Sequence, residues 1–213
     1  HRLIRRQRQM CIRDRSGTVP TPTEKNDWSI QMKSNKRIQN LVLIALFAAL
    51  TLMGTMIKIP LPTGAFLHFG NAVVLLAVLL IGYWQGALAG GIGFFIFDIL
   101  NGFAAEAPYF LVESFIVGAA AYLAFSFFKR KPTRIRQIII IGICAGIAKF
   151  IMSVIKATVM SMIAGAQLKP AFFAALATMP ATVINIFSTI LIVSLVYFPL
   201  RHAMQIIFHN QPV

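Results

Sequence analysis

Blocks of hydrophobic residues close to twenty long dominate this sequence, and short charged or proline- and glycine-containing breaks separate them. A helix of about 20 apolar residues crosses the roughly 30 Å hydrocarbon core of a bilayer. Most blocks lack the charged stripe that a helix of a soluble bundle carries. The pattern therefore predicts an all-α integral membrane protein with six transmembrane helices. The predicted segments are residues 38–57, 69–82, 85–100, 108–128, 135–164 and 170–198.

The breaks between the segments carry helix-ending and helix-starting signals. Pro60 and Pro62 follow the first segment, and neither can continue a helix. The second and third segments are separated by so few residues that they predict a tight helical hairpin. Pro108 suits the first turn of the fourth segment. In the sixth segment, Pro180 is a possible kink, and we expect the helix to end near Phe198, before the next proline.

The distribution of lysine and arginine predicts the orientation, because short cytoplasmic loops collect positive charge. With six spans, both termini lie on one side of the membrane. That side holds nine basic residues: Lys33, Lys36, Arg37, Lys129, Arg130, Lys131, Arg134, Arg136 and Arg201. The opposite side holds only Lys58 and Lys169. Both termini are therefore predicted to be cytoplasmic.

Composition supports a membrane protein and argues against nucleic-acid binding. The chain is 58% hydrophobic and 12% charged, with a mean hydropathy of +0.76. Its formal charge of +14 is typical of basic cytoplasmic loops, so no nucleic-acid partner is expected. Cys11 and Cys144 do not form a disulfide framework, and no metal or cofactor site is predicted.

The first 31 residues need a separate interpretation. The sequence RQRQMCIRDRS resembles translated adaptor sequence, and its lack of an apolar core is unlike a secretion signal. We expect residues 1–31 to be an artefactual or disordered tail. Residues 32–213 are expected to form a single six-helix transmembrane domain.

Four ionisable residues fall within or at the ends of the apolar segments: Asp98, Glu113, Lys149 and Lys156. Each is costly in lipid unless it faces a partner or a polar cavity. Lys149 and Lys156 are seven residues apart, about two helical turns, so they share a face with Ser153 between them. Ion pairing and ligand binding both remain open for these groups, and snorkelling to the surface is a further possibility for Lys156.

Three further features bear on a site. Asn185 is an amide at membrane depth that could contact a ligand or bridge two helices. The sequence KIPLPTGAFLHFG, residues 58–70, predicts a semi-rigid lid over an outward-facing pocket. His68 lies in that lid, and a lone histidine is either a satisfied loop residue or a ligand contact. The four-residue spacing of Gly82, Gly86 and Gly90 predicts a close helix-packing face.

Signatures of catalysis are missing from the sequence. It has no HExxH pair, no nucleophile elbow and no nucleotide-binding loop. We therefore expect a protein that is not an enzyme and does not hydrolyse ATP. Uphill transport would need energy from a partner or an ion gradient.

Residues 32–201 resemble the S components of energy-coupling factor (ECF) transporters. The resemblance rests on the six-helix format, on IALFAALTLMG followed by KIPLP, and on HFGNAVVLLAVLLIGYWQGALAGGIGFFIFDIL. It implies an S-component-like bundle in the bacterial plasma membrane that binds one vitamin or vitamin precursor. It also implies two kinds of partner, a transmembrane coupling subunit and a pair of cytoplasmic ATPases.

The resemblance also implies roles for particular residues. Ala45 and Ala49 of the first helix would contact the coupling subunit, although ordinary packing is the alternative. The loop of residues 60–69 would gate the site, with Glu113, Lys149 and Asn185 as the best pocket residues and His68 and Lys156 as further candidates. A planar polar ligand of the pyridoxine, hydroxymethylpyrimidine or riboflavin class fits this set. A stand-alone secondary transporter and a non-transporting membrane scaffold or enzyme are the alternatives.

Overall fold

A computed structural model describes residues 22–60 and 66–207 of the chain. These residues form six helices and a two-stranded antiparallel hairpin. The helices are α2 (Pro22–Met56), α3 (Gly70–Ile81), α4 (Tyr83–Leu100), α5 (Ala107–Phe127), α6 (Ile135–Ile163) and α7 (Leu168–Ile207), and the strands are β1 (Lys58–Pro60) and β2 (Phe66–His68). The chain divides into residues 1–41 and residues 42–213, and the second unit contains the features that bear on function.

The helices confirm the predicted membrane architecture. Five of the described helices contain a stretch long and apolar enough to cross a bilayer, and α3 is a shorter apolar helix. Helix α2 begins at Pro22 and so includes residues 22–31 of the tail that was expected to be artefactual or disordered. Residues 1–21 lie outside the described part of the chain, and the artefactual origin of the tail stays a prediction.

The predicted end of the last helix near Phe198 is wrong. Helix α7 continues through both Pro180 and Pro199 to Ile207. A proline removes one helical hydrogen bond, but neighbouring groups in a helical membrane protein often compensate for the loss. Beyond Pro199, the Arg201 guanidinium donates a hydrogen bond to the Pro132 carbonyl oxygen, 3.1 Å away, and attaches this end of α7 to the α5–α6 connection.

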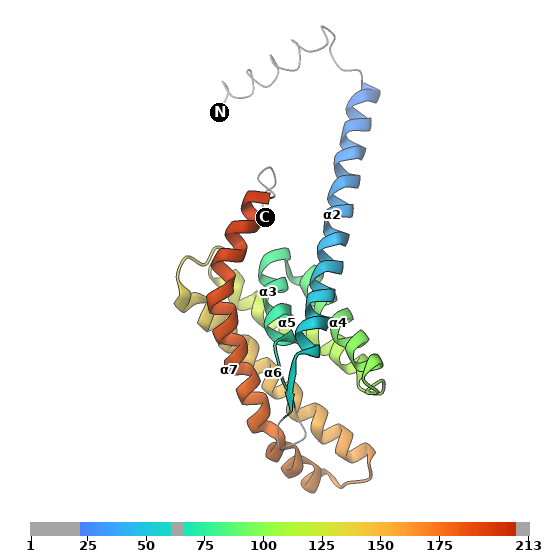
Figure 1. Cartoon of the computed structure of the whole chain (residues 1–213), viewed down its shortest axis with the longest axis vertical. Coiled ribbons are helices and arrows are strands. Elements are labelled where there is room, and N and C mark those ends of the chain that lie inside the picture. Colours follow the sequence, from blue (N-terminus) through green and yellow to red (C-terminus); the bar gives the residue numbers. More distant parts are fainter. Residues whose placement is uncertain (1–21, 61–65, 208–213) are drawn as a thin grey trace. The chain divides into compact units, whose positions relative to one another are not determined.

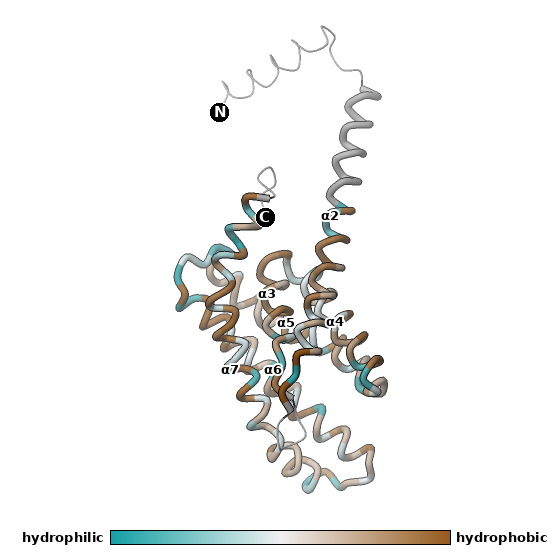
Figure 2. Tube along the Cα trace, in the orientation of Figure 1, coloured by the Kyte–Doolittle hydropathy of each residue, from teal (hydrophilic) through white to brown (hydrophobic). Residues whose placement is uncertain are grey.

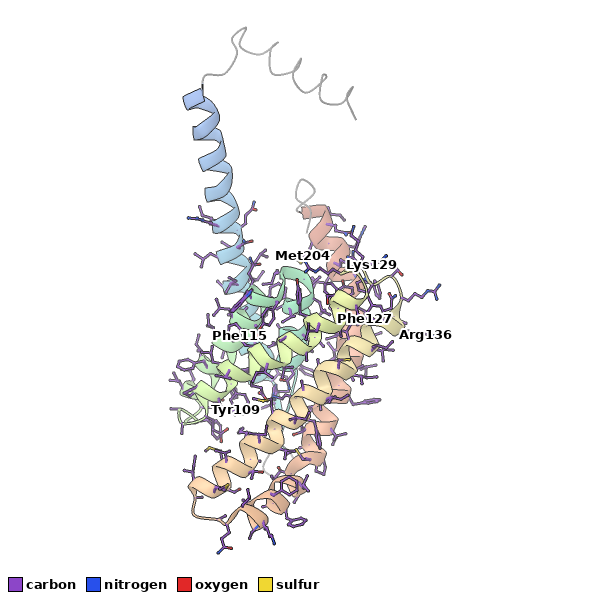
Figure 3. The ribbon with its side chains drawn as sticks, turned by 180° about the vertical axis from the view of Figure 1, so that it is seen from behind. Tyr109, Phe115, Phe127, Lys129, Arg136 and Met204 are labelled. Carbon is purple, nitrogen blue, oxygen red and sulfur yellow. The ribbon has the colours of Figure 1, made fainter. Side chains whose placement is uncertain are left out.

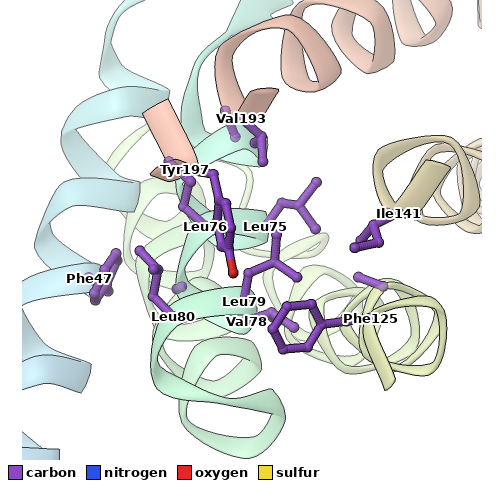
Figure 4. Close-up of a cluster of buried hydrophobic side chains, with 14 of the residues drawn as sticks. Phe47, Leu75, Leu76, Val78, Leu79, Leu80, Phe125, Ile141, Val193 and Tyr197 are labelled. Carbon is purple, nitrogen blue, oxygen red and sulfur yellow. The ribbon is translucent and has the colours of Figure 1, made fainter. Parts of the chain in front are cut away.

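The short helix α3 lies at the centre of the bundle. Nine of its twelve residues are buried, and its leucines and valines belong to one buried cluster with side chains of α2, α5, α6 and α7 (Figure 4). Twelve residues span only about 18 Å of a roughly 30 Å core. Surrounding helices cover α3, which allows it to remain short within the membrane protein.

Glycines allow α4 to approach its neighbours closely, as their spacing predicts. A Cβ on Gly86 would lie 2.5 Å from the Val78 Cα of α3, and one on Gly93 would lie 2.7 Å from the Ala48 carbonyl oxygen of α2. Gly90 likewise faces the Val74 side chain. Gly82 differs, because it has open space and a φ of +98° and provides the turn between α3 and α4.

Helices α6 and α7 lie side by side as an antiparallel pair within the second unit (Figure 1). Hydrophobic residues cover most of the helical surface, and hydrophilic residues gather at the α5–α6 connection and at the opposite helix ends (Figure 2). One end of the bundle thus collects the C-terminal end of α4, the start of α5, the end of α6 and the start of α7.

The predicted lid contains the hairpin β1–β2. Lys58 pairs with His68, Ile59 with Leu67 and Pro60 with Phe66. The sequence did not predict this pairing. Residues 61–65, including Pro62, lie outside the described residues. The backbone N–H of Phe69 donates to the Gly54 carbonyl oxygen, 2.9 Å away, and connects the base of the hairpin to α2.

Candidate functional site

A cavity of about 350 Å³ lies beside the hairpin, where α4, α5, α6 and α7 converge. Ligand cavities for drug-sized molecules start at about 300 Å³. Four phenylalanines contribute aromatic surface, and charged and amide side chains contribute polar contacts. The cavity lining includes Lys58, His68, Asn71, Phe94, Phe97, Asp98, Phe103, Glu106, Phe110, Glu113, Lys149, Ser153, Lys156 and Asn185.

The structure brings all five predicted binding residues to this cavity. His68 comes from β2, Glu113 from α5, Lys149 and Lys156 from α6, and Asn185 from α7. Ser153 also lines it, which confirms that Lys149 and Lys156 share one helix face. Their contact with a ligand remains a prediction, whereas their location in one cavity is a structural fact.

A buried ion pair crosses the cavity from α5 to α6. Lys149 Nζ donates to Glu113 Oε2 at 2.7 Å, and the two side chains are 17% and 3% exposed. The Tyr109 hydroxyl lies 2.7 Å from the Met152 carbonyl oxygen and 3.1 Å from Glu113 Oε1, so its single proton can be given to either acceptor. Ion pairing, one of the two interpretations of these charges, is therefore present, and both charged groups also face the cavity.

A second ion pair joins Lys156 to Glu106 and lies closer to the surface than the first. The Lys156 ammonium lies 4.5 Å from the Phe110 ring centroid. The ammonium of Lys149, which belongs to the first ion pair, lies 5.4 Å from the same centroid. Phe110 thus contacts both cations through its negative face. Sequence reasoning missed Glu106, which lies in a connection just before α5. The rarity of acidic residues could have drawn attention to it, because Asp98, Glu106 and Glu113 are the only carboxylate side chains in residues 32–213.

Asn185 has a role in addition to lining the cavity. Its side-chain oxygen accepts a hydrogen bond from the His68 backbone N–H at 3.1 Å. The bond fixes β2 against α7, and its two partners are 117 positions apart in the sequence. The amide therefore joins a strand to a helix at the edge of the cavity, rather than two helices as one of its sequence interpretations had it.

Two buried polar atoms of the cavity have no hydrogen-bond partner among the described residues. They are Asp98 Oδ2 and His68 Nδ1. Asp98 is 5% exposed. The His68 ring packs edge-on against Phe94, with ring centroids 5.9 Å apart. Burial, with a smaller contribution from the charge of Lys149, lowers the pKa of His68 from 6.5 to about 4, so its imidazole is neutral at physiological pH.

A smaller cavity of about 50 Å³ lies next to the first and is mostly apolar. The two cavities share four lining residues, Asn71, Phe94, Glu113 and Lys149. Gly142 and Gly146 of α6 line the smaller one, where α6 approaches Ile190 and Ile186 of α7. The Glu113–Lys149 pair therefore borders both spaces.

Basic residues gather at the opposite end of α5 from the cavity. Tyr109 marks the cavity end of this helix, and Phe127, Lys129 and Arg136 mark the other end (Figure 3). No carboxylate side chain lies between residues 114 and 207. The polar cavity and the basic α5–α6 connection thus occupy opposite ends of the bundle.

Ala45 and Ala49 lie outside the core of the second unit. Both are exposed on α2, whereas Ala48 beside them is 7% exposed. They share their side of the helix with the exposed apolar residues Val42, Leu46 and Met53. This face is therefore available for contact with lipid or with another protein.

The arrangement suits recognition of a small polar molecule. Aromatic rings provide flat surface, while carboxylates, amides and ammonium groups provide directional contacts. Among the residues that the structure describes, no cluster of three histidine, cysteine or acidic side chains could hold a metal ion.

Comparisons with known proteins give a consistent result. The family model for the ECF-type riboflavin transporter, S component, matches residues 35–202. The thiamine precursor transporter HmpT of Lactococcus lactis subsp. cremoris (strain MG1363) is 33% identical over 102 residues, which are 45% of this chain and 57% of that protein. The matched region thus spans little more than half the length of this relative. The solved S component of a bacterial ECF transporter is similar in fold, with a TM-score of 0.56 and 21% identity over 79% of this chain and 99% of the other.

Proposed function

Because this chain belongs to the family of ECF-type riboflavin transporter S components, we propose that it captures a planar vitamin or vitamin precursor in the 350 Å³ cavity. One observation carries the proposal. All three carboxylate side chains of residues 32–213 line this one cavity. The five predicted ligand contacts, of which Glu113 is one, line it as well. Carboxylates are costly in a membrane protein unless a partner or a polar solute compensates them.

The ligand class follows from the cavity walls. Four phenylalanines favour a flat ring, and the acidic, amide and imidazole groups favour ring nitrogens and hydroxyls. Riboflavin, hydroxymethylpyrimidine and pyridoxine share these properties. The family description names riboflavin and the bacterial relative transports a thiamine precursor, so these two compounds are the first ligands to test.

The proposed direction of capture is from outside the cell. The cavity lies at the end of α5 opposite the basic α5–α6 connection, and basic connections favour the cytoplasmic side. The hairpin β1–β2 lies beside the cavity and is attached to α7 through Asn185. In this orientation the hairpin is the outer cover of the site.

The proposed partners are a transmembrane coupling subunit and two cytoplasmic ATPases. The sequence lacks a nucleotide-binding loop, so ATP-driven uptake requires them. The exposed small-residue face at Ala45 and Ala49 is the proposed contact with the coupling subunit, since small residues let helix backbones approach in lipid.

Mass spectrometry of small molecules that co-purify with the protein tests the proposed function. We expect a stoichiometric flavin, pyrimidine or pyridine compound, followed by tight rebinding of that compound to protein from which it was removed. A correctly folded preparation that yields no such compound and binds none of the three candidates would contradict the proposal.

A further inference from the structure

Asp98 is the feature of the cavity that ion pairing does not explain. Glu113 has Lys149 and Glu106 has Lys156 as partners. Asp98 Oδ2 is buried and has no hydrogen-bond partner among the described residues. Leaving a buried acceptor unsatisfied costs about 1–3 kcal/mol, and more for a charged group. A native structure that retains such an atom at a cavity wall needs a reason for it.

The surroundings of Asp98 narrow the reason. Asp98 lines the cavity together with Lys156, Glu106, Lys149 and Glu113, which are the members of the two ion pairs. Each lysine is already held by its own glutamate. Redirecting a lysine to Asp98 would leave a glutamate of the cavity without its cation. Both ion pairs are therefore more stable intact, and the Asp98 oxygen remains open to a hydrogen-bond donor from outside the two pairs.

A second unpartnered atom lies in the same cavity. His68 Nδ1 is also buried without a hydrogen-bond partner, and the His68 ring is held edge-on against Phe94. By contrast, the third such atom of the described chain, Ser194 Oγ, belongs to α7 and lines neither cavity. Unsatisfied polar groups are rare in native proteins, and two of them at one cavity mark a place where a polar molecule can bind.

We propose that Asp98 is a specificity-determining residue that accepts a hydrogen bond from an N–H group on the edge of the ligand ring. The inference rests on the proposed function and extends it to the ligand chemistry. It assigns the site to neutral or cationic nitrogen heterocycles that carry a ring N–H or an exocyclic amino group. The phenylalanines contact the ring faces, and the neutral imidazole of His68 provides a second polar contact in the same cavity.

Ligand-side and protein-side changes together test this subsite. Titration calorimetry of the purified wild type in nanodiscs would compare riboflavin with 3-N-methylriboflavin, and 4-amino-5-hydroxymethyl-2-methylpyrimidine with its 4-deamino analogue. The same titrations would use Asp98→Asn and Asp98→Ala, with Ser194→Ala as the matched control. Loss of a hydrogen bond to a charged group predicts about 10- to 150-fold weaker binding.

The expected pattern is specific. Blocking the ligand donor weakens binding to the wild type. Asp98→Ala weakens binding of the unblocked ligand more than Asp98→Asn, whose amide oxygen can still accept a hydrogen bond, and the ligand-side and protein-side losses do not add. Ser194→Ala leaves the affinity unchanged. Equal wild-type affinity for blocked and unblocked ligands overturns the Asp98 subsite even if the Asp98 variants do not fold.

The outcomes also separate the two proposals. A wild type that binds one of the unblocked ligands, with both folded Asp98 variants retaining that affinity, overturns the Asp98 subsite and leaves the proposed function standing. A folded wild type that binds none of the three proposed vitamins or precursors overturns both.

Discussion

The backbone N–H of His68 donates to the side-chain oxygen of Asn185, 3.1 Å away, and this bond joins the hairpin to α7. The side chain of His68 faces the cavity that Asn185 also lines. One amide therefore contributes both to the cavity wall and to the position of its cover. A change at Asn185 should for this reason affect the movement of a ligand into and out of the site.

We predict that Asn185→Ala accelerates ligand dissociation. The substitution leaves the His68 N–H without its acceptor, at a cost of about 1–3 kcal/mol to the closed hairpin. Stopped-flow dissociation should become about tenfold faster or more, and hydrogen exchange at residues 66–68 should lose protection. Ser188→Ala is the matched control, because the Ser188 hydroxyl bonds only within α7, to the Asn185 carbonyl. Unchanged exchange of the His68 amide in Asn185→Ala would refute this role.

The two ion pairs should differ in their contribution to stability. Removing one member of the buried Glu113–Lys149 pair leaves an uncompensated charge, which typically costs about 3–5 kcal/mol. Replacing both, with Glu113→Gln and Lys149→Met, should recover most of the thermal stability. Ligand binding should remain about 2–5 kcal/mol weaker, as for a lost buried charge contact. Thermal unfolding in detergent and ligand titration measure the two effects separately.

The Glu106–Lys156 pair provides the internal comparison. Its side chains are 26% and 24% exposed, so water screens the remaining charge when one partner is removed. Lys156→Ala should cost at most about 1 kcal/mol in stability. A loss as large as that of Lys149→Ala would show that exposure does not separate the two pairs.

The positions of these groups show what the sequence could and could not predict. The seven-residue spacing of Lys149 and Lys156 placed both on the cavity face, because helical periodicity is a local property. The partners of these lysines are not local. Lys156 pairs with Glu106 of the α4–α5 connection, and helical periodicity does not predict this pair because it depends on how α5 and α6 pack.

The fold shows the same division. Apolar block lengths predicted the helices, and glycine spacing predicted the close packing of α3 and α4. The hairpin β1–β2 was not predicted, since three-residue strands beside prolines carry almost no periodic signal. The continuation of α7 through Pro199 was also missed, and the contact from Arg201 that attaches this end of the helix to Pro132 joins residues 69 positions apart in the sequence.

Acidic pH should destabilise the hairpin through His68, which lies outside the five candidate spans. Burial and the Lys149 charge lower its pKa to about 4 in the folded protein, against about 6.5 when the residue is exposed. The neutral form therefore contributes stability that is complete above about pH 6.5 and is lost as the pH falls towards 4. The full loss is about 3 kcal/mol.

Hydrogen exchange of the hairpin between pH 7.5 and 4.5, corrected for intrinsic rates, measures this loss. The wild type should lose protection below pH 6.5, and His68→Gln should lose less over the same interval. His202→Gln is the control, since His202 is exposed near the end of α7 and should leave the wild-type dependence intact. Identical pH profiles for the wild type and His68→Gln would exclude His68 as the titrating group.

Gly86 should be the least replaceable glycine of the α3–α4 contact. An added Cβ would lie 2.5 Å from the Val78 Cα and 2.6 Å from the Ala77 carbonyl carbon, which are backbone atoms that cannot rotate away. Overpacking of this kind costs about 1–3 kcal/mol or more. Gly118→Ala is the matched control, because its nearest neighbour is a Val78 methyl group at 3.3 Å. A melting temperature for Gly86→Ala equal to that of Gly118→Ala would contradict the packing role.

The α2 face at Ala45 and Ala49 yields a prediction about assembly. Both alanines are exposed, so replacing them together with leucine adds side chains to the outside of the bundle and leaves the core contacts of Ala48 and Phe47 unchanged. Leucine suits a helix in lipid. Folding and ligand affinity should therefore match the wild type, while affinity purification should recover much less coupling subunit.

Size, rather than polarity, is the variable that this experiment isolates. Helix association in lipid depends on the close approach that small residues permit, so two leucines should separate α2 from a partner helix without removing any polar contact. Ala174→Leu with Ala177→Leu adds the same volume at exposed positions of α7 and should leave assembly intact. Recovery of the coupling subunit at wild-type levels with the Ala45 and Ala49 double variant would assign this face to lipid, and the docking surface would then have to lie elsewhere on the protein.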